Sequence, residues 1–128
     1  MVPPMPTPEK PNVLVVEDEP LISDMVAQGL EDEGFRVHAV ASAEQALRHL
    51  ALHGDVDVLF TDINLPGMDG STLARWAREL KPGLSVVYAS GHVSSLDRFS
   101  AVPGSIFVPK PYTPAQICRV ITDLAAAA

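Results

Sequence analysis

The stretch from Val58 to Gly70 constrains the fold of this chain most strongly. An apolar run over 58–60 leads through Thr61 to Asp62, and a turn rich in proline and glycine follows at once. A short apolar run that ends in a turn is typical of a buried strand. Asp62 is therefore expected at the carboxyl end of a strand, where ligands bind in open α/β sheets. The alternative is that Asp62 only caps the turn, and this stretch alone does not separate the two interpretations.

Short apolar runs alternate with segments of helical periodicity along the chain. The strands are expected over 12–16, 35–40, 56–61, 84–89 and 105–108. The helices are expected over 20–34, 42–54, 70–80, 93–103 (short or irregular) and 113–124. A continuous apolar run such as Val13–Val16 is typical of a parallel strand that is covered on both faces. The alternation predicts an α/β fold with a doubly wound, five-stranded parallel sheet.

Several residues indicate how the helices begin and which side they bury. Ser42 with Gln45 resembles a capping box at the start of one helix. Thr113 is expected to cap the last helix. In the third helix, four apolar residues are expected to pack on one face: Leu73, Trp76, Ala77 and Leu80.

Composition limits the kind of protein further. With 128 residues, the chain is expected to form one domain over 12–126 behind a Pro-rich N-terminal tail over 1–11. The net charge of -7 argues against nucleic-acid binding, which needs a basic patch. Since no apolar run approaches the roughly 20 residues of a membrane span, no membrane association is expected. The single cysteine, Cys118, favours a reducing compartment and is interpreted as a small buried side chain, so a cytoplasmic location is expected.

Four of the expected strands end in polar residues that can act together. The carboxyl ends of parallel strands meet at one edge of a sheet, which brings together Glu17, Asp18, Asp62, Ser90 and Lys110. Three acids in one crevice repel one another unless a cation joins them. Mg2+ is typically held by one or two carboxylates with water and phosphate oxygens, and a lysine and a hydroxyl suit a phosphoryl group. The residues indicate a carboxylate that accepts a phosphoryl group with the help of Mg2+.

Four short motifs follow one another at these strand ends. They are Val-Glu-Asp-Glu-Pro over 16–20, Thr-Asp-Ile-Asn-Leu-Pro-Gly-Met-Asp-Gly over 61–70, Ser90-Gly91 and Lys110-Pro111. In this order, over about residues 12–126, the sequence resembles a receiver domain of a two-component response regulator. The resemblance implies the flavodoxin-like (βα)5 receiver fold. Between Ser90 and Lys110 the chain is shorter than is usual in the family, and Pro103-Gly104 interrupts the expected fourth helix.

The resemblance also implies roles for individual residues. Asp62 would be the phosphoacceptor, and Mg2+ would be bound by Glu17, Asp18, Asp62 and the main-chain carbonyl of Asn64. Binding of the phosphoryl group and switching would involve Ser90, Lys110 and the strand-five aromatic Phe107. Asn64 and His92 would tune dephosphorylation. By contrast, the other histidines are too scattered in the sequence to indicate a metal site: His38, His49 and His53.

The function implied by the resemblance is a phosphorylation-controlled switch of protein–protein interactions. A sensor histidine kinase or a phosphotransfer protein would supply the phosphoryl group, and the chain would catalyse only its own phosphorylation and dephosphorylation. It would be a stand-alone receiver, or part of a larger regulator or hybrid kinase. One alternative is a phosphohydrolase with an aspartyl nucleophile, although Asn64 stands where such enzymes usually carry a second aspartate. The other is a receiver-like binding module that is not phosphorylated, which the intact acids and Lys110 disfavour.

Overall fold

A parallel sheet forms the centre of the structure, a computed structural model that describes residues 10–91 and 101–127. Its five strands are β1 (Asn12–Val16), β2 (Arg36–Val40), β3 (Val58–Asp62), β4 (Ser85–Ser90) and β5 (Ile106–Pro109). They lie in the order β2-β1-β3-β4-β5, and each neighbouring pair is parallel. The predicted five-stranded parallel sheet is confirmed. Its strands begin and end within two residues of the expected positions.

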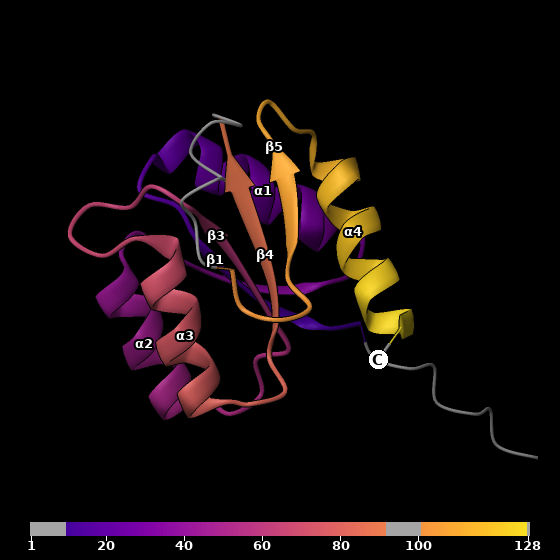
Figure 1. Ribbon diagram of the computed structural model, residues 1–128. Coiled ribbons are helices and arrows are strands. Elements are labelled where there is room, and N and C mark those ends of the chain that lie inside the picture. Colours follow the sequence, from indigo (N-terminus) through magenta and orange to yellow (C-terminus); the bar gives the residue numbers. More distant parts are fainter. Residues whose placement is uncertain (1–9, 92–100, 128) are drawn as a thin grey trace, which may run out of the picture.

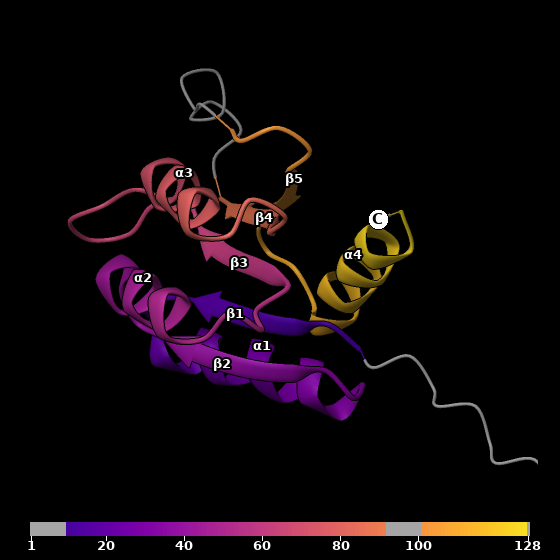
Figure 2. The same ribbon diagram turned by 90° about the horizontal axis from the view of Figure 1, so that it is seen from below.

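Helices cover both faces of the sheet. They are α1 (Pro20–Asp32), α2 (Ala43–Leu52), α3 (Gly70–Leu80) and α4 (Pro114–Ala127). Figures 1 and 2 show α1 and α4 on one face and α2 and α3 on the other. The irregular fourth helix expected over 93–103, most of the Pro-rich tail and His92 lie outside the described residues. Within the described parts of the chain, no helix combines the length and the apolar character that crossing a bilayer requires.

The apolar run of β1 shows why the sheet needs helices on both sides. Val13 and Val15 belong to the buried cluster under α1 and α4, whereas Leu14 and Val16 belong to the cluster under α2 and α3. Successive side chains of a strand point to opposite faces. A central strand buried on both faces must therefore be apolar at every position, which is the pattern found in the sequence.

Side-chain caps fix where two of the helices begin. The Ser42 hydroxyl accepts a hydrogen bond from the Gln45 backbone N–H at 3.2 Å, as predicted. The Gln45 side chain accepts from the N–H of Ala41 at 2.9 Å, one residue before the expected partner. At α4, Gln116 N–H donates to the Thr113 hydroxyl at 3.3 Å, and Gln116 Oε1 accepts from Thr113 N–H at 2.7 Å. Both caps satisfy N–H groups that have no partner inside the helix.

The expected packing of α3 is correct for only half of its apolar residues. Leu73 and Ala77 are buried, but Trp76 is 56% exposed and Leu80 is 51% exposed. The buried stripe of α3 continues through small residues, including Ala74. Small side chains let the helix approach the sheet closely, so Trp76 and Leu80 remain outside the contact. The prediction that Trp76 packs into the core is wrong.

Candidate functional site

Three acidic side chains meet at the carboxyl edge of the sheet. Because β1 and β3 are neighbours, the end of β1 brings Glu17 and Asp18 beside Asp62 at the end of β3. One carboxylate oxygen from each residue lies within 4.8 Å of those of the other two. Glu17 and Asp62 are buried, whereas Asp18 is exposed. We refer to these three residues as the acidic crevice, and its exposed member, Asp18, is open to solvent and to small ions.

The Asp62 carboxylate is held by both of its oxygens. Oδ1 accepts a hydrogen bond from the Asn64 backbone N–H at 3.0 Å. Oδ2 accepts from Lys110 Nζ at 2.6 Å in an ion pair. Charge-assisted hydrogen bonds of this kind are about twice as strong as neutral ones. The carboxylate is therefore fixed in orientation before any ligand arrives.

Lys110 reaches Asp62 from the loop that follows β5. Its backbone N–H donates to the carbonyl of Ser90 at 2.8 Å, which joins this loop to the end of β4. The peptide bond from Lys110 to Pro111 is cis. Burial favours the neutral amine of Lys110, but its hydrogen bond to Asp62 and the charges of Asp62 and Glu17 outweigh burial and raise its pKa above 10.5. Lys110 therefore supplies a positive charge to the crevice at neutral pH.

The surroundings of Glu17 disfavour the charged form of its carboxyl group. Desolvation raises the pKa of its carboxyl group above 4.5, and the negative charge of Asp62 adds to this rise. A hydrogen bond from the Glu19 backbone N–H to Glu17 Oε1, at 3.1 Å, and the charge of Lys110 act in the opposite direction without cancelling it. A cation placed between Glu17 and Asp62 would relieve this repulsion.

Three further predicted site residues belong to the described part of the chain, whereas His92 does not. Ser90 is buried at the end of β4, and Asn64 is exposed two residues after Asp62. Phe107 is partly buried on β5, and its ring stacks on that of Tyr88 with 5.1 Å between the centroids. Tyr88 is fully buried, and its hydroxyl accepts a hydrogen bond from the Val102 N–H at 3.2 Å. The sequence signal for this aromatic pair was a tyrosine inside an apolar strand, which sequence reasoning did not use.

Gly70 is a second residue whose importance sequence reasoning missed. A Cβ atom at Gly70 would lie 2.7 Å from the carbonyl oxygen of Asp62 and 3.1 Å from Cα of Ile63. The Gly70 N–H donates to the carbonyl of Ile63 at 2.8 Å. Only glycine lets the start of α3 approach the end of β3 this closely, so Gly70 helps to position the backbone of Asp62.

Comparisons with known proteins identify the family of this chain. A family model described as the response regulator receiver domain matches residues 13–122. The chain belongs to the response regulator receiver domain family. Receiver domains bind Mg2+ at an acidic pocket, and the oxygen-rich cluster described above fits such a hard cation.

Similar proteins occur both in regulators and in kinases. A response regulator receiver protein from Sinorhizobium medicae WSM419 has a TM-score of 0.84 at 35% identity, covering 93% of this chain and 97% of that one. The sensor kinase CckA of Brucella abortus is 32% identical over 88% of this chain and 12% of its own length. The transcriptional regulatory protein AruR of Pseudomonas aeruginosa is 34% identical over 84% of this chain and 46% of its own length.

The chain thus spans less than half of the length of either curated relative. The receiver domain of NtrX from Brucella abortus, by comparison, is covered completely, with a TM-score of 0.77 at 31% identity over 91% of this chain. The receiver domains of regulators and hybrid kinases are phospho-accepting modules of two-component signalling, and this chain is one of them.

Proposed function

We propose that Asp62 accepts the phosphoryl group of a phosphohistidine and that this event switches the protein–protein contacts of the receiver. The observation that carries the proposal is the buried Asp62 carboxylate at the carboxyl edge of the sheet, held by Lys110 and the Asn64 N–H and flanked by an acidic pair. Its neighbours can bind the two charged species that the reaction needs, a divalent cation and a phosphoryl group. A sensor histidine kinase or a histidine phosphotransfer protein is the donor.

In the proposed transfer, a carboxylate oxygen of Asp62 attacks the phosphorus atom of the phosphohistidine. A P–O bond forms and the P–N bond breaks. The electron pair of the broken bond stays on the imidazole nitrogen, and the ring leaves in its neutral form when its other nitrogen carries a proton. The product is an acyl phosphate on Asp62. Later attack by water at phosphorus restores the carboxylate and releases inorganic phosphate.

The side chains around Asp62 have distinct roles in this proposal. Glu17, Asp18 and Asp62, together with the main-chain carbonyl of Asn64, hold Mg2+. When bound, Mg2+ supplies positive charge that offsets the negative charge on the phosphoryl oxygens. Lys110 exchanges its contact with Asp62 Oδ2 for a phosphoryl oxygen, whose negative charge favours the protonated amine as the Asp62 carboxylate does.

Four further residues act on the phosphorylated state. The hydroxyl of Ser90 donates a hydrogen bond to a phosphoryl oxygen, and the ring of Phe107 responds through its packing against Tyr88. Asn64 and His92 set how readily water reaches phosphorus.

The donor is proposed to dock on the apolar surface beside the crevice. Leu21 is 85% exposed and Met25 is 43% exposed on α1, although both are large apolar residues. Met25 also lines a hollow of about 510 Å³, together with Ile22, Gly91, Lys110, Pro111 and Tyr112. Since Lys110 belongs both to this hollow and to the crevice, a histidine-bearing helix seated here can present its imidazole to Asp62.

The experiment is phosphorylation by a small donor, acetyl phosphate or phosphoramidate, with Mg2+, followed by intact-mass spectrometry. The parent protein should gain one phosphoryl group, and Asp62→Asn should gain none. Asp24→Asn is the matched control, because Asp24 is an exposed acid on α1 outside the crevice. Equal phosphorylation of the parent protein and Asp62→Asn would refute the assignment. Loss of phosphorylation in Asp24→Asn would show that the assay does not report on the site.

A further inference from the structure

Three histidines stack on one another beneath α2. His38 of β2 and His49 of α2 have ring centroids 4.0 Å apart, with 10° between their planes. His49 and His53 follow at 4.5 Å and 28°. Residues that are scattered in the sequence therefore lie side by side in the structure. We refer to His38, His49 and His53 as the histidine stack.

Strand register and helical spacing explain the histidine stack. His38 lies opposite Leu14 in the parallel β1–β2 pair, and Leu14 points to the face covered by α2 and α3. The His38 side chain therefore points to α2 as well. His49 and His53 are four residues apart, and the His53 N–H donates to the His49 carbonyl at 2.8 Å, as in a helix. Residues with this spacing lie on the same side of a helix.

The histidine stack borders a small cavity with further polar walls. The cavity has a volume of about 160 Å³, and its lining includes the three histidines together with Asn12, Arg36 and Asp55. The Asn12 amide nitrogen donates to the Asp55 carbonyl at 2.8 Å and to Asp55 Oδ2 at 3.1 Å, which fixes the orientation of the amide.

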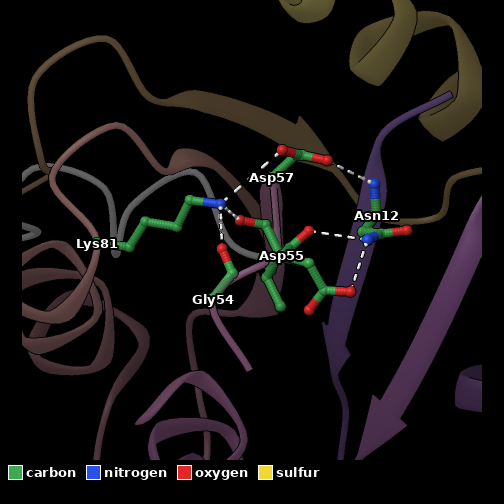
Figure 3. Close-up of polar contacts among 6 residues, drawn as sticks. Asn12, Gly54, Asp55, Asp57 and Lys81 are labelled. Atoms are coloured by element: carbon green, nitrogen blue, oxygen red, sulfur yellow. Dashed lines mark hydrogen bonds and ion pairs between the residues drawn. The ribbon is translucent and has the colours of Figure 1, made fainter. Parts of the chain in front are cut away.

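Figure 3 shows Asn12 beside Asp55 and Asp57, with Lys81 approaching from the other side. The backbone N–H of Asn12 donates to Asp57 Oδ2 at 2.9 Å. The Asn12 amide oxygen is buried, and no group of the described residues hydrogen-bonds to it. A buried acceptor without a donor is costly unless a ligand or water satisfies it. The residues that line the cavity therefore supply a carboxylate and three imidazoles.

The central imidazole of the stack favours its neutral form. Burial lowers the pKa of His49 below 6.5, and the neighbouring His38 and His53 lower it further, while the charge of Asp55 acts in the opposite direction. A neutral imidazole has a free lone pair on one nitrogen, which is the form that binds metals.

We propose that the histidine stack is a binding site for a divalent transition metal of the zinc, nickel and copper class, with Asp55 as an oxygen ligand. Imidazole suits these ions and does not suit Mg2+. Two histidines four residues apart on a helix form a recurrent zinc-binding pair, and His38 supplies a third nitrogen from β2. This site lies at the far end of β1 from the acidic crevice, so the two sites select different ions.

Binding requires the rings to turn. Each nitrogen lone pair lies in the plane of its ring, so stacked rings keep their lone pairs in separate planes and cannot direct them at one ion. Within the described chain, the one set of three His, Cys, Asp or Glu residues whose ligand atoms all converge is Glu17, Asp18 and Asp62. His38 and His53 are exposed, so rotation about their side-chain bonds meets little resistance. The metal would thus replace the stacked arrangement by a convergent one and link the edge strand β2 to the end of α2.

The test is titration of tag-free protein with Zn2+ by calorimetry, in saturating Mg2+ so that the acidic crevice is occupied. One Zn2+ per chain should bind, and the imidazole C–H signals of the three histidines should shift in NMR spectra. His49→Gln and His53→Gln should each weaken binding at least tenfold. Two matched controls should leave it unchanged: His92→Gln, which removes the fourth histidine, and Asp18→Asn, which weakens the acidic crevice.

Thermal melting without metal is the control that each variant is still folded. His38→Gln changes an exposed side chain and should melt like the parent protein, yet it should lose most of the increase in Tm that Zn2+ produces. The proposal is overturned if the parent protein binds no Zn2+ up to millimolar concentration. It is equally overturned if the variant with all three histidines replaced binds Zn2+ as tightly as the parent protein, because the acids alone would then account for binding.

Discussion

At the scale of single residues, the negative charge of Glu17 beside Asp62 is unfavourable in the crevice. Its raised pKa means that the folded state binds the proton of Glu17 more tightly than the unfolded chain does. At pH values below its pKa in the unfolded chain, this group therefore makes its full contribution to the free energy of unfolding. This contribution is lost as the pH rises through the pKa of the folded state, so the environment of Glu17 costs the metal-free protein stability above that pKa.

Glu17→Gln removes this charge and keeps an acceptor for the Glu19 N–H. We expect the metal-free variant to be more stable than the parent protein at pH 7, with the difference shrinking as the pH falls toward 4.5. Urea unfolding in EDTA across this range measures both free energies. Two parallel stability profiles would contradict the assignment of strain to Glu17.

A second residue-scale prediction concerns buried hydroxyl groups. The Tyr112 hydroxyl is buried, and none of the described residues hydrogen-bonds to it, although its ring meets Phe60 edge-on at 5.6 Å. Tyr112→Phe should leave stability unchanged or raise it by up to about 1 kcal/mol, since no hydrogen bond is lost. Tyr88→Phe, which removes the acceptor of the Val102 N–H, should cost about 1 kcal/mol. Chemical denaturation of both variants tests the contrast, and equal losses would contradict it.

At the scale of elements, the sequence predicted the strands well because most of them are apolar runs that end at a charged or turn residue, although β2 also contains Arg36 and His38. It also predicted that Glu17, Asp18, Asp62 and Lys110 would meet, because parallel strands deliver their ends to one edge; their roles stay predictions. The faces of α3 were less predictable. Apolar spacing alone does not show how wide the buried face of a helix is, and Trp76 lies outside the buried face of α3.

Gly70 offers an element-scale prediction. Gly70→Ala places a methyl group 2.7 Å from the Asp62 carbonyl oxygen, so α3 and the end of β3 must separate. Overpacking of this kind typically costs about 1–3 kcal/mol, and we expect slower phosphorylation of Asp62 as well. Gly83→Ala is the control, since no atom lies within 4 Å of its new Cβ. Denaturation measures the difference, and two variants of equal stability would contradict the close approach.

At the scale of the whole molecule, the sheet carries different chemistry at its two ends. The carboxyl edge gathers acids and one lysine, while the beginning of β1 lies near histidines and Asp55. The four-residue spacing of His49 and His53 is visible in the sequence. Their contact with His38 depends on strand register and on how α2 packs beside β2, and neither of these is visible as spacing along the chain.

The acidic edge predicts that Mg2+ stabilises the whole fold. A ligand that binds only the folded state adds RT ln(1 + [L]/Kd), or about 1.4 kcal/mol at a tenfold excess over Kd. The Tm of the parent protein should therefore rise with millimolar Mg2+, and that of Asp18→Asn should rise much less. Differential scanning calorimetry measures both. A parent Tm that ignores Mg2+ would contradict a metal site at this edge.

The exposed position of Trp76 has a practical consequence for spectroscopy. It is the only tryptophan of the chain and is already 56% exposed in the folded state. Its fluorescence emission in the native protein should therefore lie close to that of the unfolded chain and give a weak signal of denaturation. For the same reason, a blue shift of that emission would report a partner covering α3, with no label added to the protein.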